Sequence, residues 1–252
     1  MNVKFDFGGK NFVIVGASSG IGRQTAIELS ASGANILAVG RNLERLKNLK
    51  DTCPQKISTV SLDVLIANQE DWSSALKDFV SNCGKIDGAV YSAGIAGMTP
   101  LNSFDVELAH KIFDTSFWGM INFVQVAAKK KFSNAGSSFV LMSSITSAGF
   151  GTKGLFAYTA AKSAVTGVLK PLSKEIIRNR HRINAVSPSM VQTEMLSSAA
   201  AGFEIGEDEL SRYLLGIGKV EDVSGMILFL LSDRAAWITG QNFLVDGGYS
   251  IN

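Results

Sequence analysis

Tyr158 and Lys162 have side chains and a spacing that could perform chemistry. They lie in a stretch, 156–174, whose pattern predicts a helix, and residues at i and i+4 share one helix face. A phenol with a pKa of about 10 is a poor acid or base at neutral pH unless a nearby cation favours its ionised form, and Lys162 is placed to be that cation. The spacing alone is a weak signal, because short motifs recur by chance. Pro171, which has no N–H, predicts a bend in the same helix.

A glycine-rich turn near the N-terminus is the second indication of chemistry. The apolar run 11–15 predicts a strand, the pattern up to residue 32 predicts a helix, and the turn lies between them. Glycines let backbone N–H groups approach a diphosphate at the positive end of a helix. The strand and helix favour a nucleotide over a plain turn, although the spacing is G-x-x-x-G-x-G rather than G-x-G-x-x-G. The expected contact residues are Gly16, Ser18, Ser19, Gly20, Ile21 and Gly22.

The second expected strand, 34–39, is followed by Gly40 and Arg41. At this point of a dinucleotide site an Asp or Glu would accept hydrogen bonds from the adenosine ribose, whereas an Arg can pair with a 2′-phosphate. The acid is missing here and Arg41 is present, which favours NADP(H) over NAD(H). The alternative is a solvated surface arginine.

Strands and helices alternate along the rest of the chain. The expected strands are 11–15, 34–39, 57–62, 86–91, 138–142, 182–186 and 243–245, and the later helices are 69–82, 106–131, 156–174 and 220–231. Such alternation implies parallel pairing through helical crossovers. No repeat, linker or charge block divides the chain. The sequence therefore predicts one α/β domain over residues 1–252, a Rossmann-type doubly wound parallel sheet of about seven strands with helices on both faces.

Composition argues against several classes of protein. Lys and Arg number 24 and Asp and Glu number 22, so no global field favours nucleic acid or an anionic membrane. No apolar run approaches the roughly 20 residues that span a bilayer, and no secretory signal is visible, so we expect a cytoplasmic protein. Cys53 and Cys83 lack CxxC spacing, and His110 and His181 are isolated. We therefore expect free thiols and no metal site.

The motifs occur in an order that resembles the short-chain dehydrogenase/reductase family in its single-domain form. The resemblance covers nearly the whole chain, and the joint order is far more specific than any one motif. Within the family, the sequence is most similar to 3-oxoacyl-[acyl-carrier-protein] reductases and related carbonyl reductases. The matching motifs are Gly16-Ala-Ser-Ser-Gly20-Ile-Gly22, Asp63, Ser92-Ala-Gly94, Ser144, Tyr158-x-x-x-Lys162, Asn184-Ala-Val-Ser-Pro188, Ile238-Thr-Gly-Gln and Val245-Asp-Gly-Gly.

The resemblance implies catalytic roles for three side chains. Tyr158 would protonate a carbonyl oxygen as hydride arrives, and act as the base in reverse. Lys162 would lower the pKa of Tyr158 and hold the nicotinamide ribose. Ser144 would donate a hydrogen bond to the same substrate oxygen. Ser143 is the alternative serine, but Ser144 fits the family spacing to Tyr158 better.

The resemblance also implies cofactor contacts at the ends of the later strands. They are Asp63 and Val64 at the adenine, Ala93 and Gly94 near the ribose, and Pro188, Val191 and Thr193 after the sixth strand. Backbone groups of Val191 and the hydroxyl of Thr193 would fix the carboxamide, and thereby the face of the ring that meets the substrate.

Four positions depart from the family pattern. Ser116 stands where an asparagine usually helps to hold a water chain that leads protons from the lysine to solvent, and its shorter hydroxyl would hold water less firmly. We count Ser116 among the catalytic residues. Tyr91 and Ser92 replace the two asparagines of Asn-Asn-Ala-Gly, and Ser189 replaces the glycine of Pro-Gly. These departures affect rate and proton supply and leave the acid and the cofactor turn in place.

The segment 190–217 would, by similarity, be a lid over the substrate. Its apolar residues favour an apolar or amphipathic carbonyl compound, with a lid that packs its own helices as an equal alternative. They are Met195, Leu196, Phe203, Leu210, Tyr213, Leu214 and Leu215, joined by Phe150, Leu155 and Phe156 before the tyrosine. Basic residues could attract an acidic carrier protein, or be ordinary surface charge. They are Arg178, Arg180, Arg182 and the lysines 129–131.

Helix 106–131 has more apolar aromatic surface than one sheet face easily covers, from Phe113, Phe117, Trp118, Met120 and Phe123. Family members commonly pair this helix and the Tyr158 helix across a two-fold axis. We therefore expect a homo-oligomer, a homotetramer or a dimer.

Three functions stay open. The expected one is NADPH-dependent reduction of a ketone or 3-oxoacyl-type carbonyl, a small-molecule substrate that an acyl carrier could hold. The second is NAD-dependent oxidation of an alcohol by the same fold. The third is a nucleotide-sensing protein with weakened catalysis, which Ser116 and Ser92 make conceivable.

Overall fold

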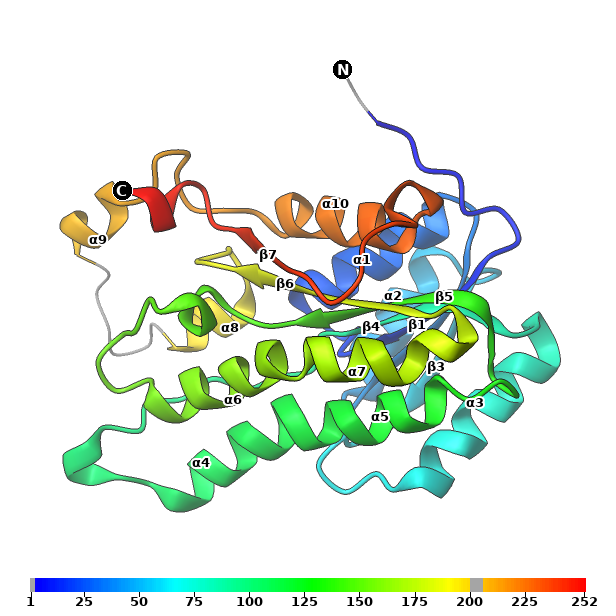
Figure 1. Cartoon of the computed structure of the whole chain (residues 1–252), viewed down its shortest axis with the longest axis horizontal. Coiled ribbons are helices and arrows are strands. Elements are labelled where there is room, and N and C mark those ends of the chain that lie inside the picture. The colour runs from blue at the N-terminus through cyan, green and yellow to red at the C-terminus, as the bar shows by residue number, and fades with distance from the viewer. Residues whose placement is uncertain (1–2, 200–205) are drawn as a thin grey trace.

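Seven parallel strands form one sheet in the computed structural model, which describes residues 3–199 and 206–252. They are β1 (Asn11–Val15), β2 (Asn35–Gly40), β3 (Ile57–Ser61), β4 (Ile86–Tyr91), β5 (Ser133–Met142), β6 (Arg182–Pro188) and β7 (Asn242–Val245). Their order in the sheet is β3-β2-β1-β4-β5-β6-β7 (Figure 1). The order reverses between β1 and β4, the point at which doubly wound sheets bind ligands. The predicted class, strand number and parallel pairing are confirmed.

Helices cover both faces of the sheet. They are α1 (Gly20–Ala31), α2 (Leu43–Thr52), α3 (Gln69–Cys83), α4 (Val106–Phe113), α5 (Gly119–Ala127), α6 (Phe156–Gly167), α7 (Leu169–Ile176), α8 (Glu194–Ala199), α9 (Glu207–Ser211) and α10 (Val220–Leu231). Because successive strand residues point to opposite faces, Val13 and Val15 pack with α3 and α5, whereas Phe12 and Ile14 pack with α1 and α10. Figure 1 shows α1 and α10 above the sheet and α4 to α7 below it.

The expected helix 106–131 forms as α4 and α5, joined by one π-helical turn at Asp114–Trp118. A π turn leaves carbonyl groups without their usual partners, and the hydroxyl of Tyr91 donates to the carbonyl of Thr115 at 2.7 Å. A Cβ at Gly119 would lie 2.6 Å from that hydroxyl, so glycine makes room for it. The helix ends at Ala127, and the prediction that it continues to residue 131 is wrong.

Most of the aromatic surface of this helix is covered within the chain itself. Phe117, Met120 and Phe123 are buried in the core, because they face the sheet. Trp118 points away from the core and is 53% exposed. The sheet therefore covers most of this surface, while Phe113 is half-buried and Trp118 stays exposed.

The expected helix 156–174 forms as α6 and α7, with an interruption at Val168. Pro171 has no N–H to donate to the carbonyl of Gly167, so the regular bonding pattern fails in the turn before the proline. The predicted irregularity is present, and it divides the Tyr158 helix from α7.

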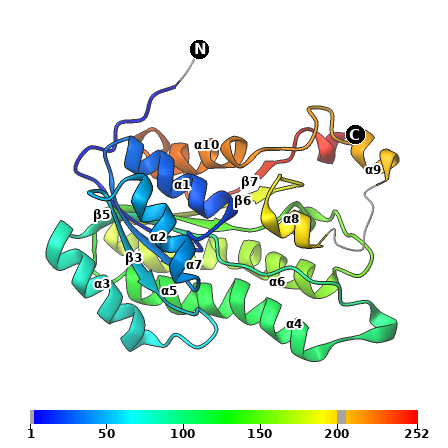
Figure 2. The same ribbon diagram turned by 180° about the vertical axis from the view of Figure 1, so that it is seen from behind.

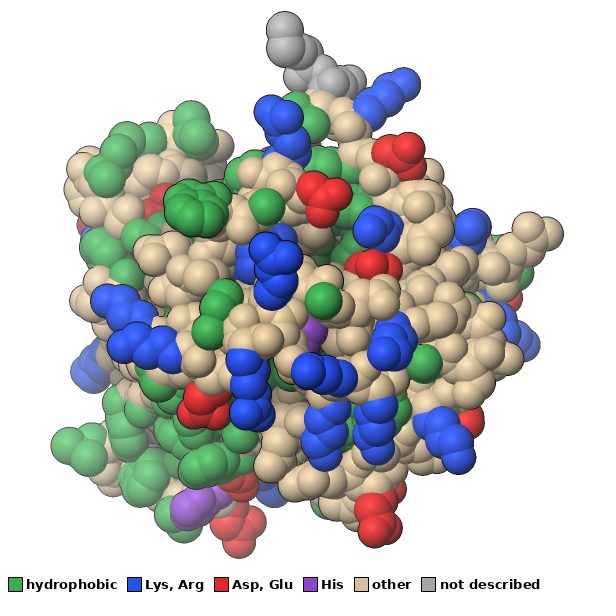
Figure 3. All heavy atoms as spheres, turned by 45° about the vertical axis from the view of Figure 1, so that its right-hand side comes forward, with side chains coloured by type: hydrophobic (Ala, Val, Ile, Leu, Met, Phe, Trp, Pro, Cys, Tyr) green, Lys and Arg blue, Asp and Glu red, His purple; other side chains and the backbone are tan. Residues whose placement is uncertain are grey.

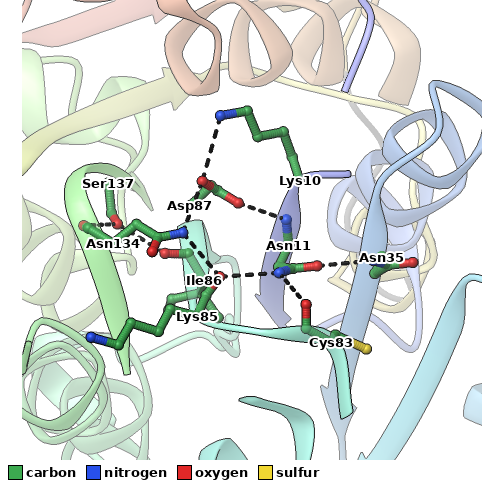
Figure 4. A network of polar contacts seen from close by, with 9 residues as sticks. All are labelled: Lys10, Asn11, Asn35, Cys83, Lys85, Ile86, Asp87, Asn134 and Ser137. Atoms are coloured by element: carbon green, nitrogen blue, oxygen red, sulfur yellow. Dashed lines mark hydrogen bonds and ion pairs between the residues drawn. The ribbon is translucent and has the colours of Figure 1, made fainter. Parts of the chain in front are cut away.

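A polar network around the buried Asn11 holds the amino end of the sheet (Figure 4). The Asn11 side chain donates to the carbonyls of Cys83 at 2.8 Å and Lys85 at 3.1 Å, and accepts from the Asn35 side chain at 2.9 Å. Asp87 accepts from the backbone N–H of Asn11 at 2.9 Å. The network joins β1, β2 and β4 at the edge opposite the glycine turn.

Asn11→Ala should lower the free energy of unfolding by about 2–3 kcal/mol, because buried carbonyl and amide groups lose their partners. Urea denaturation measures this change. Asn134→Ala is the control, since the exposed Asn134 donates to the same Lys85 carbonyl at 3.2 Å and should cost less than about 1 kcal/mol. Equal losses in the two variants would contradict the role given to Asn11.

Candidate active site

The carboxyl ends of β1, β4, β5 and β6 bring most of the predicted site residues to one edge of the sheet. β1 leads into Gly16, β4 into Ser92, β5 into Ser143 and Ser144, and β6 ends at Pro188. The carboxyl ends of parallel strands meet at one edge, so segments far apart in the sequence lie together here. Figure 2 shows α8 on the side of the molecule where α1 and α2 begin.

The glycine turn is packed too closely for side chains at two of its positions. A Cβ at Gly16 would lie 2.6 Å from the backbone nitrogen of Ala93, and a Cβ at Gly22 would lie 2.4 Å from the Gly16 carbonyl oxygen and 2.5 Å from Ser92 Oγ. Gly16 and Gly20 also have positive φ angles, 85° and 54°. The turn therefore brings bare backbone to the end of the sheet, as a bound diphosphate requires.

The start of α1 differs from the starts of the next three helices. Asn42, Asn68 and Asp105 cap α2, α3 and α4 with their side chains. The N-cap of α1, Ser19, makes no side-chain cap bond, and the first turn of α1 has no acidic residue. Backbone N–H groups at the positive end of α1 are thus available to an anion, which fits the diphosphate of a dinucleotide.

Ser144 and Tyr158 meet at this edge. Ser144 hydrogen-bonds the Tyr158 hydroxyl, and Ser144 Oγ also accepts from the backbone N–H of Thr146 at 3.3 Å. Burial raises the pKa of the Tyr158 phenol, and the bond with Ser144 opposes the rise. The hydroxyl is desolvated, although the residue keeps some exposed surface. A phenol in this setting is protonated at neutral pH and placed to donate its proton.

Lys162 lies one turn along the same helix and is only 4% exposed. Its Nζ donates to the Met142 carbonyl at 2.9 Å and lies 5.7 Å from the centre of the Tyr158 ring. Burial lowers its pKa to about 8, so the amine is mostly a cation at neutral pH. The pKa of Tyr158 is raised in this structure, with no lowering by Lys162. That Lys162 lowers the pKa of Tyr158 once the cofactor is bound stays a prediction.

The two candidate serines have different surroundings. Ser143 Oγ donates to the backbone carbonyl of Lys162 at 2.8 Å and contacts Ser147 Oγ at 3.1 Å, so it fastens β5 to α6. Ser144 is the one that bonds the Tyr158 phenol. The geometry favours Ser144 as the catalytic serine and gives Ser143 a structural contact.

Ser116 lies in the π turn beneath this cluster. Its Oγ is buried and has no hydrogen-bond partner among the described residues. A Cβ on Gly94 would lie 3.4 Å from Lys162 Nζ and 3.7 Å from Ser116 Oγ, so both polar atoms lie against this glycine. A buried hydroxyl without a partner is costly, which fits a position that water or a ligand group completes.

The adenosine end contains Arg41 and Asp63, which lie 3.9 Å apart between Nη1 and Oδ2. The Arg41 side chain is 61% exposed, so a ligand can reach it. Val64 is buried, and its carbonyl oxygen would lie 3.1 Å from a Cβ on Gly119. The two side chains thus lie side by side beyond the carboxyl ends of β2 and β3.

After Pro188, the chain returns over the glycine turn. Met190 accepts from Gly218, and Gln192 donates to Gly218, so the backbone groups of Val191 between them face the other way. Thr193 lies against Gly20, where a Cβ would be 3.4 Å from the threonine methyl carbon. The Thr193 hydroxyl accepts from the backbone N–H of Leu196 at 3.3 Å and so caps α8.

Two contacts near the site had no signal in the sequence order. Ser189 Oγ lies 2.8 Å from the hydroxyl of Tyr213, which gives the departure from Pro-Gly a partner in the predicted lid. Arg45 Nη1 in α2 lies 2.5 Å from Glu194 Oε2 in α8. The residue types were visible in the sequence, but only the fold brings such distant segments together.

The basic residues considered for a carrier protein lie at the other end of the sheet. Lysines 129–131 precede β5, and Arg178 and Arg180 precede β6. Figure 3 brings this amino end forward and shows Lys and Arg side chains gathered on it. Arg182 is not a surface charge, because it is buried and its guanidinium donates to the carbonyl of Leu230 at 2.9 Å. None of these residues borders Tyr158.

The described part of the chain contains no cluster of side chains that could serve as metal ligands. No three His, Cys, Asp or Glu side chains gather there in a way that could hold a metal ion. Over the same residues, no helix has the length and apolar character needed to cross a bilayer.

Comparison with known proteins agrees with this geometry. The family described as enoyl-(acyl carrier protein) reductase matches residues 16–250. A 3-oxoacyl-[acyl-carrier-protein] reductase of Thermotoga maritima is 31% identical over 96% of this chain and 98% of its own length. Carbonyl reductase [NADPH] 2 of Sus scrofa is 32% identical over 98% and 99%, and an NAD-dependent glycerol dehydrogenase of Listeria innocua is 31% identical over 98% and 96%.

Among solved structures, a short-chain dehydrogenase/reductase of Brucella melitensis superimposes with a TM-score of 0.90. It is 27% identical, and the match covers 98% of this chain and 99% of that one. The fold and site thus define a nucleotide-dependent oxidoreductase of the Rossmann type. The chain belongs to the short-chain dehydrogenase/reductase family.

The buried Lys162 should leave a signature in the pH dependence of stability. Its pKa of about 8 in the folded protein lies below the ordinary lysine value of 10.5, so the unfolded chain binds more protons between these pH values. Stability should therefore rise between about pH 8 and pH 10, by up to about 3 kcal/mol. Urea denaturation at pH 7 to 10 measures this, and Lys162→Met should lack the rise. A wild-type stability that falls over this range relative to the variant would contradict the burial of a charged amine.

Proposed function

We propose that this protein reduces a ketone or a 3-oxoacyl-type carbonyl to an alcohol with NADPH. The observation that carries the proposal is the contact between Ser144 and the Tyr158 phenol, with the buried Lys162 one helical turn away. This cluster lies at the same sheet edge as the glycine turn. When bound, the nicotinamide cofactor supplies the hydride.

Side chains of the protein then bind and protonate the carbonyl oxygen. Ser144 donates a hydrogen bond to it and stabilises the negative charge that grows in the transition state. Tyr158 donates the proton that completes the alcohol. The raised pKa of Tyr158 keeps this proton on the phenol until negative charge develops nearby. Lys162 would hold the ribose hydroxyls, and the Ser116 hydroxyl, which lies against the same Gly94, would hold a water that leads protons to it.

The remaining cofactor contacts follow the same edge. The glycine turn and the start of α1 would hold the diphosphate, and Asp63 and Val64 would contact the adenine. Arg41 pairs with the 2′-phosphate, which supports NADP(H) over NAD(H). The NAD-dependent Listeria relative supports the alternative, oxidation of an alcohol with NAD, and the Asp63 carboxylate near Arg41 weakens the preference for a phosphate.

The substrate is a small apolar or amphipathic carbonyl compound. After Ser144 the chain enters an apolar cluster in which Ile145 packs with Tyr213 and Tyr249, and Phe150 lies against it. Tyr213 comes from the lid 190–217, so the lid shares a core with the residues next to the catalytic serine. Phe203, also named for the lid, lies outside the described residues. An acyl carrier on the substrate is supported by the Thermotoga relative and not by the basic residues at the far edge.

Tyr158→Phe should reduce turnover by at least about 10³-fold, because the acid is lost, while NADPH binding stays intact. NADPH consumption with β-keto esters, diketones and a 3-oxoacyl thioester measures turnover, and fluorescence titration measures binding. Turnover in this variant at the wild-type rate would refute the acid role. Wild-type binding without turnover on any substrate of the panel would favour a nucleotide sensor instead.

Ser144→Ala should reduce kcat by about 10²–10³-fold with little change in thermal stability, because it removes a donor to the developing oxyanion. Ser143→Ala is the matched control. It removes the bond to the Lys162 backbone, so it should lower the melting temperature and reduce kcat less. The reverse pattern would assign the catalytic role to Ser143.

We also propose a cytoplasmic homo-oligomer, a dimer or tetramer. Trp118 is half exposed on the helix that α6 packs against, and a groove of about 720 Å³ lined by Ile121, Leu172 and Ile176 runs between α5 and α7. Charged residues such as Lys129, Glu175 and Arg178 also line the groove, and a second copy of the chain would cover its apolar part together with Trp118.

Trp118→Glu should shift the protein toward the monomer in sedimentation velocity at micromolar concentration, because a charge would be buried in the contact. Ile66→Glu is the control, since Ile66 is 82% exposed in a loop before α3 and should not change the sedimentation. A wild-type monomer at this concentration would overturn the assembly proposal.

A further inference from the structure

An ion pair connects the first turn of α2 with the first residue of α8. Arg45 Nη1 and Glu194 Oε2 are 2.5 Å apart. The next residue back from Glu194, Thr193, lies against Gly20 of the glycine turn. The pair therefore spans the mouth of the proposed nucleotide site, from the helix after Arg41 to the start of the lid.

The same corner holds a second pair, between Arg41 and Asp63, in which the charged atoms are 3.9 Å apart. Asn42, between the two arginines, accepts from the backbone N–H of Arg45 and fixes the first turn of α2 at the end of β2. Both arginines thus lie where β2 passes into α2, and each has a carboxylate beside it. The four side chains together carry no net charge, so the corner is balanced before any ligand arrives.

The Arg45–Glu194 pair is open to solvent. The side chains are 48% and 63% exposed, so a pair of this kind stabilises little and can exchange one partner for another. A phosphate dianion offers a guanidinium more charge and more acceptor oxygens than one carboxylate does. A 2′-phosphate at this corner would therefore compete with Glu194 for Arg45.

Building on the proposed function, we propose that Arg45 is a second 2′-phosphate-binding residue and that Glu194 is the internal anion that occupies it in the absence of a 2′-phosphate. NADP(H) binding then transfers Arg45 from Glu194 to the phosphate and breaks the ion pair that connects α2 with α8. NAD(H), which has a hydroxyl at this position, leaves the pair in place. Coenzyme choice and the anchoring of the lid are coupled through one guanidinium.

Isothermal titration calorimetry with NADP⁺ and NAD⁺ tests this without turnover, because the two ligands differ only in the 2′-phosphate. Glu194→Gln should raise the affinity for NADP⁺ about two- to fivefold, since a competing exposed partner is removed, and leave NAD⁺ unchanged. Arg45→Gln should lower the affinity for NADP⁺ about tenfold, again with NAD⁺ unchanged. In the double variant the Glu194 substitution should have no further effect, because its target is gone.

Two controls separate this exchange from general electrostatics. Glu44→Gln removes a carboxylate from the same turn of α2, and Lys47→Gln removes an exposed cation from the same helix. Each should change NADP⁺ affinity by less than about twofold.

The proposal is overturned if Glu194→Gln weakens NADP⁺ binding, changes both coenzymes equally or has no effect, or if Arg45→Gln leaves NADP⁺ affinity at the wild-type value. A wild-type protein that binds neither coenzyme would instead refute the nucleotide site on which the proposed function rests.

Discussion

A reciprocal pair of hydrogen bonds fixes the catalytic helix to the sheet, and the rest of the site depends on it. Lys162 Nζ donates to the carbonyl of Met142, the last residue of β5, and Ser143 Oγ donates back to the carbonyl of Lys162. The two bonds set the distance between β5 and α6, and that distance brings Ser144 to the Tyr158 phenol. Burying an ammonium is unfavourable, so the amine is retained at a cost in stability, as is common at functional sites.

The departures from the family pattern are accommodated by their neighbours in different ways. Ser92 Oγ fills the space beside Gly22, and Ser189 gains the Tyr213 hydroxyl as a partner. The large Tyr91 fits because Gly119 is small, and its hydroxyl satisfies a carbonyl of the π turn. Ser116 alone of these has a polar atom without a partner in the described structure. It is therefore the departure that bears most directly on chemistry.

The elements that depend on a local pattern of residues could be predicted from the sequence. Alternating apolar runs gave the seven strands, and glycine spacing placed the turn after β1. Signals that depend on tertiary contacts were misjudged. Arg182 reads as one more surface arginine, yet it is buried and its guanidinium donates to the Leu230 carbonyl in the last turn of α10. Phe123 reads as excess aromatic surface, yet it packs against Trp72 with ring centres 4.9 Å apart. A periodic pattern shows which residues share a face and not what covers that face.

The choice between the two coenzymes depends on a difference between two sets of interactions. The arginines can pair with a 2′-phosphate, or they can pair with carboxylates of the protein. An arginine after β2 favours a phosphate only to the extent that the phosphate offers more than the partner it displaces. Here Asp63 lies near Arg41 and Glu194 lies on Arg45, so each cation has an anion to exchange. In the proposed site, the net free energy gained from a 2′-phosphate is its interaction free energy with both guanidinium groups minus that of the two ion pairs it breaks. Both pairs are exposed and therefore weak, so under the proposed function the balance would still favour the phosphate. The carboxylates would make such a preference smaller than two unpaired arginines would, which is consistent with relatives named for NADPH and for NAD.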